Sequence, residues 1–304
     1  MTTLTSVRPS GHAPAVAALV AGALAMGVSP VMVRLADVGP FASAFWRVAL
    51  ALPALWLWMR WSEAARPVPR RGSTWTRPVV IAGVVFALDL FFWHLAITHT
   101  SIANATFFAT CAPLWVVVFG WLLFRERASR ATLAGLGLCV VGGAALVWQS
   151  LRLAPGHVAG DLLGMITGVF FGLYFLAVRA AREGGAGAAR VTFGMSVIAA
   201  ALLFVVAVAA EPRLLPRSPA GWEALLGLSL VSHAGGQGLL SYALGLLPAV
   251  FSSLVIFLEA IAAAIAALVI LHEPVSLLQG CGGLLIVAGI WIARPRRSDP
   301  AVEL

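Results

Sequence analysis

Two acidic residues fall in the middle of long apolar stretches of the sequence. Asp89 lies within residues 78–98, and Glu259 lies within residues 249–271. An ionisable side chain at the centre of a bilayer costs about 2.5 to 3.5 kcal/mol on insertion scales, so such residues usually face the interior of a helical bundle and serve a function. Because burial disfavours a charged carboxylate, the protonated form becomes accessible near neutral pH, as a proton-coupled carrier requires. A purely structural pair, of either acid with Arg47 or a histidine, is the alternative.

Three further polar side chains could complete a site with these acids. His233 and Gln237 are one helical turn apart and therefore share a face of their predicted helix, so we expect them to form a polar wall of a cavity. A histidine that only packs and hydrogen-bonds is an equal alternative. Arg47 could hold a substrate carboxylate, because a guanidinium group matches the geometry of that anion. Equally, Arg47 could neutralise Asp89 or extend to the outer interface.

Histidine and aromatic residues provide the remaining candidates. His94 lies five residues after Asp89, about 140° around a helix, so the two cannot both point squarely into one pocket. Trp93 and Tyr242 could line an aromatic pocket, together with Trp46 and Tyr174. Most aromatic side chains of a membrane protein, however, anchor it at the interface or pack the bundle.

The composition places all of these residues in a membrane protein. The 304 residues are 61% hydrophobic and only 11% charged, with a mean hydropathy of +0.97, far outside the range of soluble domains. A bilayer core of about 30 Å needs roughly 20 apolar residues per helix, and continuous apolar runs favour helices over barrel strands. The predicted fold class is an all-α polytopic membrane protein with ten transmembrane helices. The helices are expected at residues 14–34, 40–60, 78–98, 102–124, 131–149, 160–180, 190–210, 222–245, 249–271 and 276–294.

The basic residues follow the predicted topology. All twenty are arginines, and with the N-terminus inside the cell most fall in cytoplasmic segments, such as residues 60–77 and 125–130. Only Arg152, Arg213 and Arg217 fall in segments on the opposite side. This asymmetry is the positive-inside rule, so the formal charge of +8 needs no nucleic-acid partner. Both termini are predicted to be cytoplasmic.

The sequence contains an internal repeat. An apolar run, a charged turn and a second run with glycines seven residues apart occur at 102–148 and again at 250–293. Five helices are an odd number, so the second copy must have the opposite orientation, as in transporters with a site near the bilayer midplane. We expect one membrane domain over 1–304, composed of repeats at 14–150 and 158–295. A shift of 147 positions superposes Ala96 on Ala243, Glu126 on Glu273, Ser129 on Ser276, Gly135 on Gly282 and Gly142 on Gly289.

Short motifs along the chain carry a family resemblance. They are Arg47 in the second run, Pro113 in the fourth, Phe124-Arg125-Glu126-Arg127 after it, Gly160-Asp161 at the start of the sixth, and Leu258-Glu259 in the ninth. Together they resemble the drug/metabolite transporter (DMT) superfamily, specifically its EamA-type ten-helix members. Two departures are Ala260, where the family often has proline, and the second turn, which is His272-Glu273-Pro274. The resemblance implies two inverted five-helix repeats, a multi-pass exporter in the bacterial inner (plasma) membrane, and no cofactor.

We therefore predict a secondary transporter that exports amino acids or related small metabolites by alternating access. The expected partners are a small-molecule substrate and the lipid bilayer; a homodimer could form through glycine stripes, which packing within one chain explains equally well. The alternative is an intramembrane enzyme or lipid-modifying protein that uses Asp89 with a histidine as acid and base. An enzyme, however, needs no inverted duplication. Phosphate-binding loops, nucleophile elbows and metal-spaced histidines are also absent from the sequence. The candidates for substrate binding or coupling are Asp89, His233, Gln237, Glu259, Arg47, Trp93, His94 and Tyr242.

Overall fold

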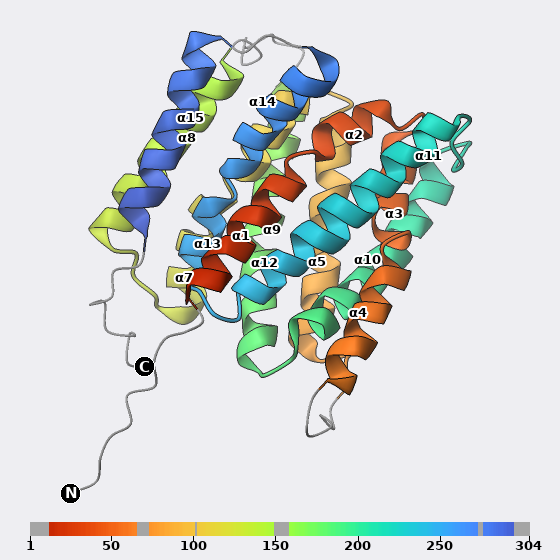
Figure 1. Cartoon of the computed structure of the whole chain (residues 1–304), viewed down its shortest axis with the longest axis horizontal. Helices are drawn as coiled ribbons and strands as arrows, with labels where there is room; N and C mark the ends of the chain where they lie inside the picture. The colour runs from red at the N-terminus through yellow and green to blue at the C-terminus, as the bar shows by residue number, and fades with distance from the viewer. Residues whose placement is uncertain (1–11, 66–72, 101, 149–157, 273–275, 295–304) are drawn as a thin grey trace, which may run out of the picture.

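The computed structural model describes residues 12–65, 73–100, 102–148, 158–272 and 276–294, and within these ranges every regular element is a helix. Figure 1 shows the helices side by side in one bundle. In chain order they form ten crossings: α1 (His12–Met26) with α2 (Ser29–Leu35); α3 (Pro40–Ala49) with α4 (Leu52–Ala64); α5 (Arg77–Ala96); α6 (Ile102–Thr110) with α7 (Ala112–Phe124); α8 (Arg130–Val147); α9 (Val158–Glu183); α10 (Ala188–Ala210); α11 (Pro219–Leu226), η2 (Gly227–Gln237) and α12 (Gly238–Ala243); α13 (Ala249–Val255) with α14 (Leu258–Leu271); and α15 (Leu277–Ala293).

The predicted ten-helix membrane fold is confirmed. Eight crossings are long and apolar enough by themselves to span a bilayer. The eighth crossing is divided by the π-helix η2, and the tenth is the 17-residue helix α15. Residues 150 and 295, where the two repeats were predicted to end, lie outside the described residues.

Prolines divide three of the crossings. Pro30, Pro53 and Pro113 lie in the first turns of α2, α4 and α7. A proline has no amide hydrogen for the carbonyl four residues earlier and fits only the first turn of a new helix, so each crossing is broken just before it. Polar backbone groups thereby become available in the centre of the protein.

The two halves meet through reciprocal glycine contacts between α8 and α15, which lie against each other in Figure 1. A Cβ added to Gly142 would lie 2.5 Å from the carbonyl oxygen of Gly282, and one added to Gly282 would lie 2.6 Å from that of Gly142. Gly135 and Gly289 are paired in the same way. The 147-position shift places Gly142 on Gly289 and Gly135 on Gly282, so the two glycine contacts are equivalent. Only a two-fold relation between the halves produces such reciprocal contacts.

A second pair of equivalent contacts involves the first and sixth crossings. A Cβ on Gly27 would lie 2.7 Å from the carbonyl oxygen of Glu259, and one on Gly172 would lie 3.1 Å from that of Ala112. The 147-position shift pairs Ala112 with Glu259. The backbones of the two halves are therefore alike at this position, whereas the carboxyl group occurs only in the second half.

The charged turns that follow the fourth and ninth crossings end their helices. Arg125 and His272 are also related by the 147-position shift, and both adopt the left-handed conformation, with φ of 59° and 57°. A left-handed residue terminates an α-helix. Glu126 then forms an ion pair of 2.6 Å with Arg179 of α9. The equivalent acid, Glu273, and its neighbour Pro274 lie outside the described residues.

Candidate functional site

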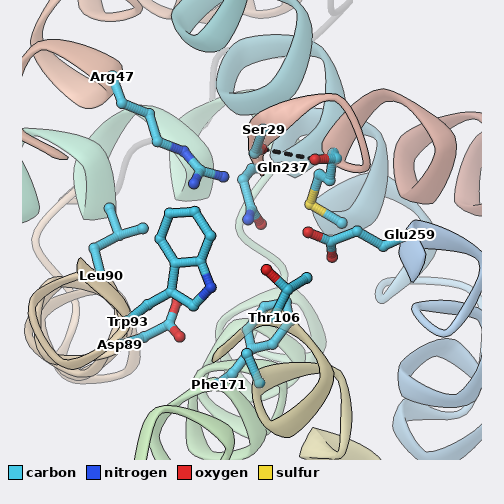
Figure 2. Close-up of a pocket in the computed structure, with 11 residues that line it drawn as sticks. Ser29, Arg47, Asp89, Leu90, Trp93, Thr106, Phe171, Gln237 and Glu259 are labelled. Carbon is cyan, nitrogen blue, oxygen red and sulfur yellow. Dashed lines mark hydrogen bonds between the residues drawn. The ribbon is translucent and has the colours of Figure 1, made fainter. Parts of the chain in front are cut away.

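A pocket lies in the interior of the bundle, between helices of both halves (Figure 2). Seven of the ten crossings contribute to its lining, and only the fifth, seventh and tenth do not. The lining residues are Met26, Ser29, Arg47, Asp89, Leu90, Trp93, Thr106, Ala109, Phe171, Gln237 and Glu259.

Three charged side chains line this pocket without binding one another directly. Figure 2 shows Arg47, Asp89 and Glu259 approaching the cavity from different helices. Arg47 interacts electrostatically with both acids, but among the described residues neither carboxylate makes a hydrogen bond or an ion pair. Arg47 and Asp89 are only 6% and 7% exposed, so Arg47 does not extend to the membrane surface. The pocket therefore offers one cation and two carboxyl groups to a ligand.

Residues of the second half hold Arg47 in place. The N-terminus of its helix α3 is bound by the Glu211 carboxylate, which accepts hydrogen bonds from the backbone N–H groups of Phe41 (2.6 Å) and Ala42 (3.2 Å). A carboxylate at this end of a helix is favoured by the helix dipole. The guanidinium donates to Ser232 Oγ over 3.2 Å, while its Nε has no partner among the described residues. The guanidinium thus keeps hydrogen-bond capacity for a ligand.

The π-helix η2 determines which residues of the eighth crossing reach the pocket. A π-helix joins residues five apart by its hydrogen bonds, so Ser232 and Gln237 come to lie over one another, whereas in an α-helix they would be about 140° apart. Ser232 binds Arg47, and Gln237 lines the pocket. The Gln237 Oε1 atom accepts a 2.9 Å hydrogen bond from the hydroxyl of Tyr174. Within the described part of the chain, the amide NH₂ then remains to donate to a ligand.

His233, expected beside Gln237, is not among the lining residues. Its Nε2 atom lies 2.9 Å from Ser196 Oγ, and its ring packs on Phe86 with a centroid distance of 5.4 Å. The side chain is fully buried, and its Nδ1 atom has no partner within the described chain. His233 therefore lies in the packed interface between the third, seventh and eighth crossings.

The remaining candidates divide between the pocket and its surroundings. Trp93 lines the pocket. His94 is fully buried beside it, with Nδ1 2.7 Å from the carbonyl oxygen of Leu90, and is not a lining residue. Tyr242 is 36% exposed on α12 and also lies outside the lining. The structure thus brings together Arg47, Asp89, Trp93, Gln237 and Glu259.

Several lining residues were not predicted from the sequence as site residues. Ser29 lies at the break in the first crossing, where its hydroxyl donates to the carbonyl oxygen of Met26 over 2.6 Å (dashed in Figure 2). A hydroxyl group beside Pro30 is the signal in the sequence that could have identified Ser29. Thr106 also lines the pocket, and its hydroxyl has no partner among the described residues.

The pocket is narrow in this conformation. The centre of a water molecule can occupy about 40 Å³ of it. One water needs roughly 10–15 Å³ by the same measure, so only a few waters fit. A metabolite with several heavy atoms can enter only when the helices around the pocket move apart.

Two inverted halves around a central polar pocket define a membrane transporter of small molecules. The sequence model of the EamA-like transporter family matches residues 13–148 and 158–294, and the chain belongs to this family.

Proteins from archaea and bacteria are similar to the chain. An uncharacterized transporter of Archaeoglobus fulgidus is 24% identical over 280 residues, which cover 88% of this chain and 92% of that protein. An uncharacterized transporter of Helicobacter pylori is 30% identical over 172 residues, 54% of each chain. The pseudopaline exporter CntI of Pseudomonas aeruginosa is 30% identical over 135 residues, 44% of this chain and 45% of that protein.

A solved crystal structure shares the fold. It superposes with a TM-score of 0.78 over 93% of this chain and 98% of its own, at 20% sequence identity. Among the residues described, no three His, Cys, Asp or Glu side chains are grouped to hold a metal ion.

Proposed function

We propose that the protein exports a small metabolite that carries both a carboxylate and an amine, such as an amino acid or a related compound. The observation that carries the proposal is the set of unpaired opposite charges in the pocket, with Arg47 on one side and Asp89 and Glu259 on the others. A guanidinium binds a carboxylate with two parallel hydrogen bonds. A carboxylate on the opposite wall would hold the amine.

Asp89 and Glu259 would also carry protons. Neither carboxylate has a hydrogen-bond donor among the described residues to stabilise its charge. A desolvated carboxyl group of this kind exchanges protons readily with its surroundings. We propose that substrate and proton compete for these acids, which couples export to the proton gradient.

Alternating access follows from the inverted halves and the narrow pocket. The halves would rock about the pocket and open it to one side of the membrane at a time. The outward direction is supported by the pseudopaline exporter, one of the similar proteins. We further propose that both termini are cytoplasmic and that the two repeats are the functional halves. The proposed site includes Gln237 and Trp93 in the pocket lining. His94, His233 and Tyr242 would act from outside the lining.

An enzymatic function is less well supported. It would require Asp89 to act with His94 or His233 as an acid–base pair. In the described chain, His94 bonds the Leu90 carbonyl, His233 bonds Ser196, and Asp89 bonds neither. We propose that the protein is not an enzyme and uses neither a cofactor nor a nucleic-acid partner.

The decisive experiment is transport by the purified full-length protein in proteoliposomes. A panel of amino acids, amines and carboxylic acids would be tested with and without an imposed pH gradient. We expect compounds with both charged groups to be transported, and Arg47→Gln to raise the KM for them at least tenfold. Replacing the exposed Glu223 by Gln is the control and should change nothing. An unchanged KM of the amino acids in Arg47→Gln, or transport of amines without a carboxylate at the same KM as the amino acids, would contradict the proposal.

A further inference from the structure

Arg47 is linked to the break in the first crossing by a chain of buried hydrogen bonds. Its Nη2 atom lies 3.2 Å from Ser232 Oγ, which lies 2.5 Å from Ser29 Oγ, which lies 2.6 Å from the carbonyl oxygen of Met26. The two serines are 0% and 1% exposed. The chain joins three crossings from both halves, and Arg47, Ser29 and Met26 all line the pocket.

The direction of each hydrogen bond follows from the groups involved. A carbonyl oxygen only accepts, so the single hydroxyl hydrogen of Ser29 is donated to Met26. The Ser29 oxygen must then accept the hydrogen of Ser232, and the Ser232 oxygen accepts from the guanidinium, which only donates. Every bond therefore points from Arg47 toward Met26, and bonds aligned in this way strengthen one another.

The last acceptor is a backbone group that the proline break leaves without its helical partner. In an uninterrupted helix the Met26 carbonyl would accept the amide hydrogen of residue 30, but Pro30 has none. The Ser29 hydroxyl takes the place of that amide. The orientation of Arg47 and the geometry of the α1–α2 break are thus fixed by the same chain.

We infer that Ser232 and Ser29 are positioning residues, which aim the Arg47 guanidinium into the pocket and couple its binding state to the break between α1 and α2. The role of Arg47 toward a carboxylate rests on the proposed function; the hydrogen-bond chain does not. When a carboxylate draws the guanidinium away from Ser232, the chain loses its first donor. The break then becomes free to change its angle, which opens or closes the pocket beside it.

Hydrogen–deuterium exchange of the purified full-length protein tests the coupling without any substrate. Ser232→Ala removes the middle of the chain, and we expect the amides of residues 27–33 to exchange about three to ten times faster. Ser229→Ala is the matched control, because Ser229 is a fully buried serine one turn away on η2 with no hydrogen-bond partner among the described residues. It should leave these amides unchanged.

A double-mutant comparison separates coupling from local loosening. Arg47→Gln should accelerate exchange at residues 27–33 as Ser232→Ala does, and the double variant should exchange no faster than either single variant, because both interrupt one chain. Unchanged exchange in Arg47→Gln, or additive effects in the double variant, would overturn the inference. If Ser232→Ala fails to fold, Arg47→Gln and Ser232→Thr, which keeps the hydroxyl, decide the same question.

The positioning role is tested by kinetics in proteoliposomes, using a transported amino acid from the panel and its carboxamide. Ser232→Ala should raise the KM of the amino acid about fivefold, leave that of the carboxamide unchanged, and be rescued by Ser232→Thr. Equal effects on both compounds would refute positioning. If no panel compound is transported, the proposed function fails, and the exchange measurement still decides whether the chain couples Arg47 to the break.

Discussion

Glu259 occupies in the second half of the protein the position that Ala112 occupies in the first. Each residue presents its carbonyl oxygen to a glycine of a neighbouring crossing, Gly27 in one half and Gly172 in the other. The packing is conserved between the halves while the side-chain chemistry is not. The carboxyl group of Glu259 is thus an addition that the packing of this helix pair does not require.

Glu259 should therefore be replaceable without loss of the fold. We expect Glu259→Gln to be expressed and to unfold within a few degrees of the parent protein, because its carboxylate has no hydrogen bond or ion pair among the described residues. Transport driven by a pH gradient should fall at least tenfold, more steeply than exchange of substrate at equal pH. Asp89→Asn combined with Glu259→Gln should abolish it. Full pH-driven transport by the double variant would end the proton-coupling proposal.

The reciprocal glycine contacts predict a large effect of one methyl group. Gly142→Ala would place a Cβ about 2.5 Å from the Gly282 carbonyl oxygen, so we expect it to destabilise the protein by about 1–3 kcal/mol. Gly137→Ala, on the same helix, meets nothing within 4 Å and should be neutral or stabilising by up to about 1 kcal/mol. Thermal unfolding in detergent measures both. Equal melting temperatures for the two variants would contradict the tight contact.

Tyr174 is expected to affect substrate binding through Gln237. Tyr174→Phe removes the donor to Gln237 Oε1 and lets the amide rotate, so the KM should rise about threefold to tenfold with little change in kcat. Thr192→Val is the control, since Thr192 is also buried, donates its hydroxyl to the Ala188 carbonyl oxygen and lies outside the pocket lining. An unchanged KM in Tyr174→Phe would show that the amide is held by other groups.

The ion pair between Glu126 and Arg179 should contribute little to stability. Its side chains are 29% and 24% exposed, and ion pairs that water can reach contribute about 0–1 kcal/mol. Glu126→Gln should lower the melting temperature slightly, and the difference should shrink in high salt. A large loss of transport with intact stability would instead assign this pair a part in the transport cycle.

The proposed orientation can be tested with single cysteines. In a background without Cys111, Cys139 and Cys281, Ser73→Cys should react with an impermeant maleimide only from the cytoplasmic side. Arg213→Cys should react only from the outside. Both positions are exposed in the structure. The opposite pattern would reverse the predicted topology.

The sequence was sufficient to predict the helices, their number and the inverted repeat, because apolar length and glycine spacing report directly on lipid burial and close helix packing. It also selected Arg47, Asp89 and Glu259, because charges are costly in lipid and tend to gather in an interior cavity. The sequence did not show that Gln237 lines the pocket whereas His233 does not. That choice depends on the π-helix η2, and no residue pattern in Gly227–Gln237 marks the change of helical period.

The glycine pairs between α8 and α15 also have a consequence for the second conformation that alternating access requires. Because one half has the same fold as the other turned upside down, each half displays the shape that its counterpart can adopt. Exchanging the conformations of the two halves about the Gly142–Gly282 contact would generate the state that faces the opposite side of the membrane, with the α8–α15 contact itself unchanged. This contact would therefore be the fixed pivot between the two halves during transport. Distances across the contact should stay constant, whereas distances across the pocket should change.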